Sequence, residues 1–156
     1  MSEARRIRHQ LQLTYRGKAW HGPSLLENLD GLTAEVASEH PLAGLHSIWE
    51  IVRHIAAWEK EAAQVLNGKD YVTLQGAEDW PPVTGSSEEA WRGALAELHA
   101  AHSALVEAVR KLTDEDLEKP VPGSEFSFYI LLHGVVHHNL YHGGQIGLLR
   151  KAALAR

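Results

Sequence analysis

The chain has 156 residues, a length typical of one domain, so we expect residues 1–156 to fold as a single unit. Fifteen lysines and arginines against twenty aspartates and glutamates give a net charge of −5, which argues against nucleic-acid binding because no basic field is available for phosphates. Cysteine is absent, which excludes disulfides, iron–sulfur clusters, thiolate zinc sites and cysteine nucleophiles. No segment approaches the roughly 20 apolar residues of a membrane span, and no apolar signal core is present, so we expect a cytoplasmic protein without a membrane partner.

Apolar residues in the first half of the chain predict two helical regions separated by a connector. Three- and four-residue spacing predicts a helix over Arg5–Arg16, and the same spacing resumes over Leu25–Leu29. The intervening Trp20–Ser24 stretch breaks the pattern, so we expect a kinked or two-part first helix. The second helix is predicted to begin at Ser47, which has a glutamate three residues later as in a capping box, and to continue to Asn67–Gly68.

The second half of the chain predicts two further helices and two long connections. Residues Lys69–Gly85 show no periodicity and contain two adjacent prolines, as expected of a long crossover segment. Helical spacing then runs over Trp91–Leu112, and Pro120–Gly123 stops any continuation. A final helix is predicted over about Phe126–Ala153. Four main helices without a strong strand predict an all-α fold of the bundle type.

Eleven histidines in 156 residues are an excess that needs an explanation. Four of them lie in the final predicted helix and form two pairs at a spacing of four residues, which places two imidazoles on one face. On a helical wheel His138 and His142 fall in the apolar stripe that includes Leu149, so they face the core. His133 and His137 fall on a different face and are candidates for the surface or an interface.

A third histidine, in the second predicted helix, completes a possible ligand set. His54 lies at the edge of the apolar stripe of that helix, close on the wheel to Trp58 and Ile51. Buried histidines without partners are costly, so something inside the bundle must satisfy them. One explanation is a set of hydrogen-bonded core histidines. The other is a metal site of His54, His138 and His142, which leaves a coordination position open for water or substrate. The Glu-x-x-His pairs of di-iron bundles and the glycine loops of nucleotide-binding proteins are absent.

Five further residues are candidates for the surroundings of such a site. Glu50, one turn before the histidine of the second helix, is placed to accept a hydrogen bond from its ring, although a role in the capping box is the simpler interpretation. Gln145, three residues after the last histidine, is placed to contact a metal-bound water or substrate. Trp58 and Tyr141 are candidates for the walls of a pocket, with plain core packing as the alternative. His21, at the break in the first helix, is a candidate for the mouth of the bundle, with solvent exposure as the alternative.

Two segments carry a recognisable pattern. The first is Ser47–Glu59, which reads SIWEIVRHIAAWE, and the second is His138–Ile146, which reads HNLYHGGQI. Together with the Trp20–Ser24 stretch and the order of the helices, they resemble the DinB/YfiT-like superfamily over nearly the whole chain. The resemblance implies an up-down-down-up four-helix bundle with long crossover loops and a kinked first helix.

The resemblance also implies a metal site built from one histidine of the second helix and a His-x-x-x-His pair of the fourth. These positions correspond to His54, His138 and His142. Members of the superfamily carry zinc, nickel, iron or manganese, and some transfer bacillithiol, mycothiol or glutathione to small electrophiles or use these thiols in isomerisation. Relatives often read His-Arg-Gly-Gln where this chain has Gly143 after the last histidine, so a basic contact to an acidic thiol is absent here.

Two functions remain open at this point. The first is a metal-dependent enzyme, a thiol S-transferase or a hydrolase, that acts on a small molecule. The second is a non-catalytic bundle that binds a metal or small ligand, or serves as an interaction module. We also expect a homodimer, because His133, Val136, Leu140 and Gly147 lie on a second face of the final helix that a monomer would leave partly exposed.

Overall fold

A computed structural model describes residues 1–155, and its regular structure is helical. The helices are α1 (Glu3–Tyr15), α2 (Leu25–Leu29), α3 (Ala34–Ser38), α4 (Ile48–Leu66), α5 (Glu88–Arg110), α6 (Asp114–Leu117) and α7 (Phe128–Leu154). Within the described residues there are two isolated β-bridges and no strand. The predicted all-α fold is therefore confirmed. None of these helices is both long enough and apolar enough to cross a membrane.

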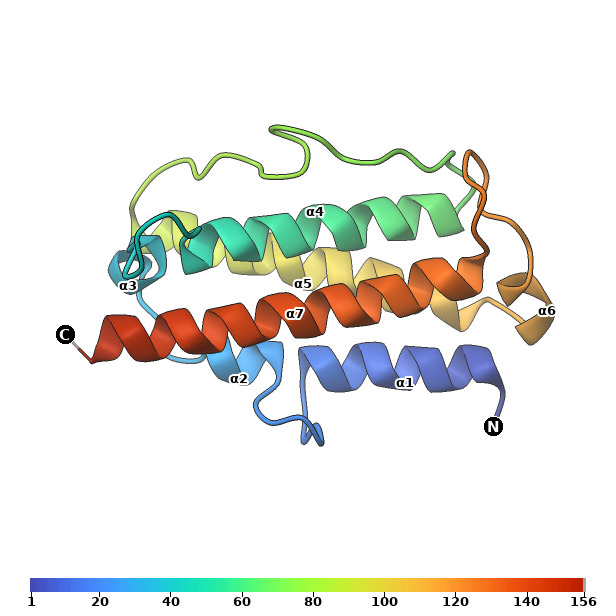
Figure 1. The fold of residues 1–156 in the computed structure, drawn as a ribbon, viewed down its shortest axis with the longest axis horizontal. Coiled ribbons are helices and arrows are strands. Elements are labelled where there is room, and N and C mark those ends of the chain that lie inside the picture. The colour runs from blue at the N-terminus through green and yellow to red at the C-terminus, as the bar shows by residue number, and fades with distance from the viewer. Residues whose placement is uncertain (156) are drawn as a thin grey trace.

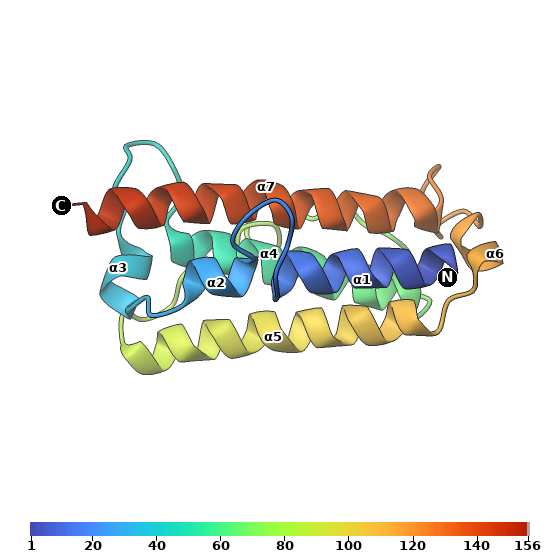
Figure 2. The same cartoon turned by 90° about the horizontal axis from the view of Figure 1, so that it is seen from below.

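The main helices α1, α4, α5 and α7 pack against one another as a bundle (Figure 1). Helices α4 and α5 run in the same direction, and α1 and α7 run in the opposite direction. Parallel neighbours cannot be joined by a short turn, so residues 67–87 pass back along the bundle as a crossover segment. Helix α2 continues roughly along the line of α1 after a loop of residues 16–24 (Figure 2), so this side of the bundle consists of two separate helices.

The start of α4 follows directly from its sequence. The side-chain oxygen of Ser47 accepts a hydrogen bond from the backbone N–H of Glu50 (3.2 Å), and the Glu50 carboxylate accepts one from the backbone N–H of Ser47 (2.7 Å). This predicted capping box satisfies N–H groups that the helix itself leaves without partners. Helix α5 begins in a related way at Ser87, whose side chain accepts from the N–H of Ala90. The capping box therefore fixes the residue at which α4 begins.

The core consists of two apolar clusters that occupy opposite ends of the bundle. The first includes Trp49 on α4 and Trp91 on α5, which pack together near the beginnings of these helices. The second includes Leu11 on α1, Leu105 on α5 and Leu132 on α7. On α4, α5 and α7 alike, a short stretch with buried polar residues separates the members of the two clusters. A polar layer therefore crosses the middle of the bundle, and the candidate functional residues lie in or beside it.

The face of α7 that the sequence predicts to be partly exposed is half-buried at His133, Leu140 and Gly147 and buried at Val136. Val136 is buried in the second apolar cluster and Leu140 packs against that cluster, while the Gly147 backbone faces the side chain of Asn28. The expected partial exposure therefore holds for the three half-buried residues and is wrong only for Val136, because α1 packs against α7 there. A different set of residues, here called the exposed stripe, faces solvent: Ile130, Gly134, His137, Tyr141, Gly144 and Leu148.

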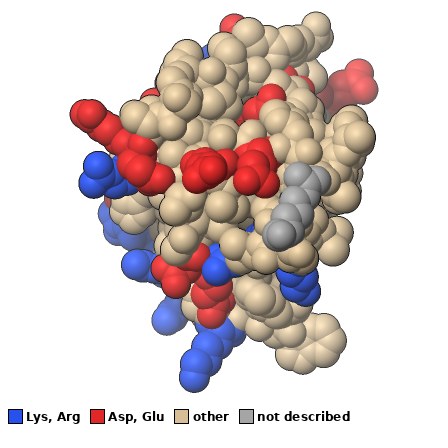
Figure 3. Space-filling model, turned by 90° about the vertical axis from the view of Figure 1, so that its left-hand side faces the viewer, with Lys and Arg blue, Asp and Glu red and all other residues tan. Residues whose placement is uncertain are grey.

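Charged side chains of both signs occupy the end of the bundle that lies near α3 and the C-terminal part of α7 (Figure 3). Acidic side chains form a row across this face, and basic side chains lie mostly below them. Among the residues drawn in colour, no continuous basic surface covers this end. The distribution agrees with the net charge of −5.

Candidate metal centre

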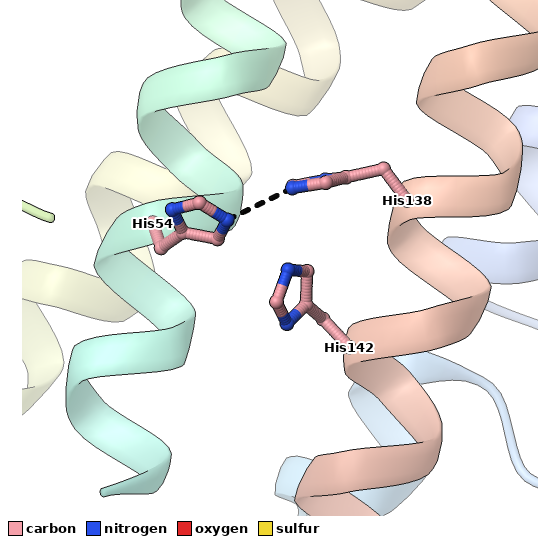
Figure 4. A group of neighbouring side chains, drawn as sticks. All are labelled: His54, His138 and His142. Carbon is pink, nitrogen blue, oxygen red and sulfur yellow. Dashed lines mark hydrogen bonds between the residues drawn. The ribbon is translucent and has the colours of Figure 1, made fainter. Parts of the chain in front are cut away.

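Three histidines from two helices converge near the middle of the bundle. His54 lies on α4, and His138 and His142 lie one turn apart on α7 (Figure 4). One ring nitrogen of each lies within 4.8 Å of the others, and Nε2 of His138 is 2.9 Å from Nε2 of His54. His54 and His142 are buried, and His138 is half-buried. The packing of α4 against α7 therefore brings together the three histidines that the sequence singled out.

Hydrogen bonds orient two of the three rings. Nδ1 of His54 lies 2.7 Å from the backbone carbonyl oxygen of Asp79, and Nδ1 of His142 lies 2.7 Å from Oε1 of Gln145. A carbonyl oxygen only accepts, so each Nδ1 carries the proton and donates it. The Nε2 atoms of His54 and His142 are then unprotonated, which is the form that a metal ligand needs.

Burial keeps the three rings uncharged. The pKa of His138 and of His142 is lowered to about 4, mainly by burial and to a smaller extent by the neighbouring imidazoles. The pKa of His54 is also lowered, again mainly by burial. At neutral pH the rings are therefore uncharged, which is the charge state that binds metal, and no imidazolium has to lose a proton. Three neutral imidazoles are a donor set that divalent transition metals accept, so the residues fit the implied metal.

Hydrogen bonds attach the crossover segment to α4 beside the histidines. The Asp79 carboxylate accepts a hydrogen bond from Nε1–H of Trp58 (2.7 Å), in addition to the bond between its backbone carbonyl and the histidine of α4. The backbone carbonyl of Pro82 accepts one from the Arg53 guanidinium (2.8 Å). The segment is therefore held against α4 on both sides of residue 80, although it contains no helix or strand.

An aromatic stack covers one side of the group. The Trp80 ring stacks on the His54 ring with centroids 3.9 Å apart, and it also stacks on the His46 ring with centroids 3.6 Å apart. The sequence predicts only a long crossover here and does not single out Asp79 or Trp80. No local signal marks them, because a loop without periodicity does not reveal which of its residues will face a helix.

The candidates for the surroundings of the site are divided between the site and the solvent. Gln145 orients one ring as described above, and the Trp58 ring lies 6.1 Å from that of His138. The Tyr141 side chain is exposed, with its ring 5.0 Å from that of the histidine that follows it. His21 is exposed in the loop of residues 16–24 and makes no hydrogen bond or ring contact with the three histidines.

Glu50 does not accept a hydrogen bond from His54. Its carboxylate accepts from the backbone N–H of Ser47 and lies 3.1 Å from Nε2 of His40. The prediction that it supports the metal ligand is wrong, and the capping interpretation is correct. The physical reason is that the side chain folds back over the helix start, while Nδ1 of His54 points to the crossover segment and meets Asp79 instead.

A buried polar cluster beside the histidines was missed by the sequence analysis. Glu59 on α4 is 0% exposed, and its Oε1 accepts hydrogen bonds from Nδ1 of His102 on α5 (3.0 Å) and from Nδ2 of Asn139 on α7 (2.7 Å). A signal was present in the sequence. Glu59 follows the buried Ile55 by four residues and precedes the buried Ala62 by three, which places its carboxylate on the apolar face of α4.

The fold and the site define the class of protein as a helical bundle in which three histidines from two helices converge. A family profile described as the DinB superfamily matches residues 20–146, which is most of the chain and includes all three histidines. The chain therefore belongs to the DinB superfamily, as the resemblance of its two histidine segments implies. Neither the curated proteins nor the solved structures gave a match.

Proposed function

We propose that this protein binds one divalent metal ion through the Nε2 atoms of His54, His138 and His142. The candidates are zinc, nickel, iron and manganese, of which the first three suit neutral imidazole best. The observation that carries the proposal is a pair of hydrogen bonds, in which Nδ1 of His54 donates to Asp79 and Nδ1 of His142 donates to Gln145. These bonds leave Nε2 of both rings unprotonated within one group.

We also propose the up-down-down-up bundle that the resemblance implies, and the helix directions in Figure 1 support it.

We infer that the metal serves a reaction of a small molecule. Three protein ligands leave at least one coordination position for a thiol or a water molecule. A bound divalent metal favours the thiolate form of a thiol and the hydroxide form of water near neutral pH. The rings of Trp58, Trp80 and Tyr141 lie near the histidines and would hold an electrophilic substrate. In thiol S-transfer the thiol proton goes to solvent, and the sulfur bonds to the substrate carbon as the leaving group departs. With water in place of the thiol the reaction is hydrolysis.

A non-catalytic bundle that binds a metal or a small ligand is the second candidate, and one observation favours it. The Asp79 carboxylate lies at the site, 3.2 Å from Nδ1 of His54, but its Oδ1 already accepts a hydrogen bond from Trp58. Among the described residues no other carboxylate lies close to a ring nitrogen of the three histidines. A free general base of the kind that many enzymes use is therefore missing from this set.

Metal content per chain tests the metal binding that both candidate functions share. Elemental analysis of untagged protein should find close to one metal per chain in the wild type and almost none in the variant His138→Ala/His142→Ala. The matched control is His133→Ala/His137→Ala, which removes an equally spaced pair from another part of α7 and should retain the metal. Equal and negligible metal in all three proteins would contradict the proposal.

Cobalt-substituted protein distinguishes the enzyme from the binding bundle. Titration with glutathione, bacillithiol or mycothiol should produce a sulfur-to-cobalt charge-transfer band if a thiol occupies the open position. Turnover of model electrophiles with the same thiol would then support S-transfer, and turnover of activated esters without a thiol would support hydrolysis. Metal binding with neither the band nor any turnover would favour the non-catalytic bundle.

We further propose that two chains pair through the exposed stripe of α7. The stripe contains no lysine, arginine, aspartate or glutamate, and its residues follow one another at alternating spacings of four and three, which is the repeat of paired helices. It is also self-complementary. An antiparallel pair centred on position 139 would bring together residues of the stripe from the two chains as follows: Ile130 with Leu148, Gly134 with Gly144, and His137 with Tyr141. A second copy of the chain is therefore the partner that suits this surface.

A further inference from the structure

The ring of His138 differs from the other two in its surroundings. Nδ1 of His54 and Nδ1 of His142 donate to oxygens, whereas Nδ1 of His138 is buried without a hydrogen-bond partner among the described residues. Its Nε2 lies 2.9 Å from Nε2 of His54, and the latter bears a lone pair, so Nε2 of His138 is the donor. If Nε2 becomes a metal ligand, the proton of the neutral ring must move to Nδ1. A buried donor then needs an acceptor.

A matching acceptor lies on the next residue. Oδ1 of Asn139 is buried and has no hydrogen-bond partner among the described residues. Burial has the largest effect on the pKa of His138 and lowers it, whereas the Asn139 side chain raises this pKa, as an acceptor near the ring does. The direction of the amide is determined by Glu59, because a carboxylate only accepts and Nδ2 of Asn139 donates to it at 2.7 Å. The amide oxygen is therefore left for another donor.

Glu59 is itself held from several sides. Its Oε1 accepts from Nδ1 of His102 on α5 as well as from Asn139 on α7, and the His102 ring stacks on that of Tyr15 with centroids 3.8 Å apart. These contacts connect α4, α5, α7 and α1, so the carboxylate cannot turn without disturbing the bundle. Burying a carboxylate is costly even when it is paired, and its Oε2 has no partner among the described residues. Stability alone is a weak reason to place such a group beside the histidines.

We propose that Asn139 is a positioning residue for the metal centre, which accepts a hydrogen bond from Nδ1–H of His138 when metal is bound and is itself held by Glu59. The inference rests on the proposed metal binding. With this hydrogen bond all three imidazoles would donate Nδ1–H to an oxygen, because the other two already donate to the Asp79 carbonyl and the Gln145 amide. Such contacts orient the ring and raise its basicity, and their loss typically weakens metal affinity by about 10- to 100-fold.

A matched pair of variants separates this role from a purely structural one. Asn139→Ala and His102→Ala each remove one hydrogen bond to the same buried oxygen of Glu59. Only the first also removes the acceptor for His138. Zinc affinity, measured near neutral pH by competition with a chromogenic chelator, should fall by about 10- to 100-fold in Asn139→Ala. It should stay close to the wild-type value in His102→Ala. Equal affinities in the two variants would overturn the proposal.

NMR of the wild type tests the same hydrogen bond even if a variant fails to fold. In zinc-loaded protein the Nδ1 proton of His138 should exchange slowly and show a nuclear Overhauser effect to the side chain of Asn139. In chelator-treated protein the ring proton should be on Nε2. A rapidly exchanging Nδ1 proton in the zinc-loaded wild type would overturn the inference while leaving metal binding intact. A wild type that binds no zinc would instead refute the proposed function, so the two failures are distinguishable.

Discussion

The burial of His138 and His142 makes the stability of the metal-free protein depend on pH. Each ring has an ordinary pKa of 6.5, which applies to the unfolded chain, and a pKa of about 4 in the folded protein. Between these two values the unfolded chain binds protons that the folded chain does not bind. The contribution of these neutral, buried rings to the free energy of unfolding is therefore complete above about pH 6.5, and it is lost progressively as the pH falls toward 4.

The size of this loss follows from the shift. One pKa unit corresponds to about 1.4 kcal/mol, so a ring shifted from 6.5 to about 4 accounts for about 3 kcal/mol of unfolding free energy. His142 is buried and contributes most of this amount, while His138 is half-buried and its share is reduced by solvent. We therefore expect a total loss on the order of 3 kcal/mol, a large part of the stability of a typical domain.

Urea unfolding at a series of pH values measures the effect, with the metal removed by a chelator. Carboxylates also titrate in this range, so the reference is the variant His138→Leu/His142→Leu, which keeps them and lacks the two rings. The unfolding free energy of the wild type relative to the variant should rise by about 3 kcal/mol from pH 4 to 6.5 and then level off. Parallel curves for the two proteins would show that these rings are not held neutral by burial.

Three further predictions follow from particular contacts. Trp80→Ala removes the ring stacked on His54 and should speed the release of zinc to a chelator in stopped-flow traces, without changing the amount bound; unchanged release would contradict a covering role. Leu148→Glu should convert a dimer into a monomer in sedimentation with unchanged helix content, and a wild type that sediments as a monomer would refute pairing through the exposed stripe. Leu132→Ala should reduce the unfolding free energy in urea by about 2–5 kcal/mol, because the side chain is fully buried, whereas a loss below 1 kcal/mol would place it outside the core.

The helices and the three histidines could be predicted from the sequence because both depend on short-range relations. The start of α4 at Ser47 is determined by a side chain and an N–H group three residues apart. His138 and His142 share a direction because four residues make about one helical turn. The position of His54 on the inner side of α4 follows from the same periodicity.

The partners of the histidines could not be predicted in this way. Glu50 has a spacing that suits both the capping box and a hydrogen bond to His54, and only the position of the crossover segment decided that Asp79 accepts from that ring. Glu59 carried a signal on the apolar face of α4, but its partners come from α5 and α7, far away in the chain.

The sequence by itself determined which segments are helical and which histidines share a face, because these properties depend on residues a few positions apart. Only the tertiary structure decided which oxygen each ring nitrogen meets and which part of α7 faces solvent. Val136 shows the reason, since its burial depends on how α1 packs against α7. Such contacts join segments that are distant in sequence, and no periodicity within one helix encodes them.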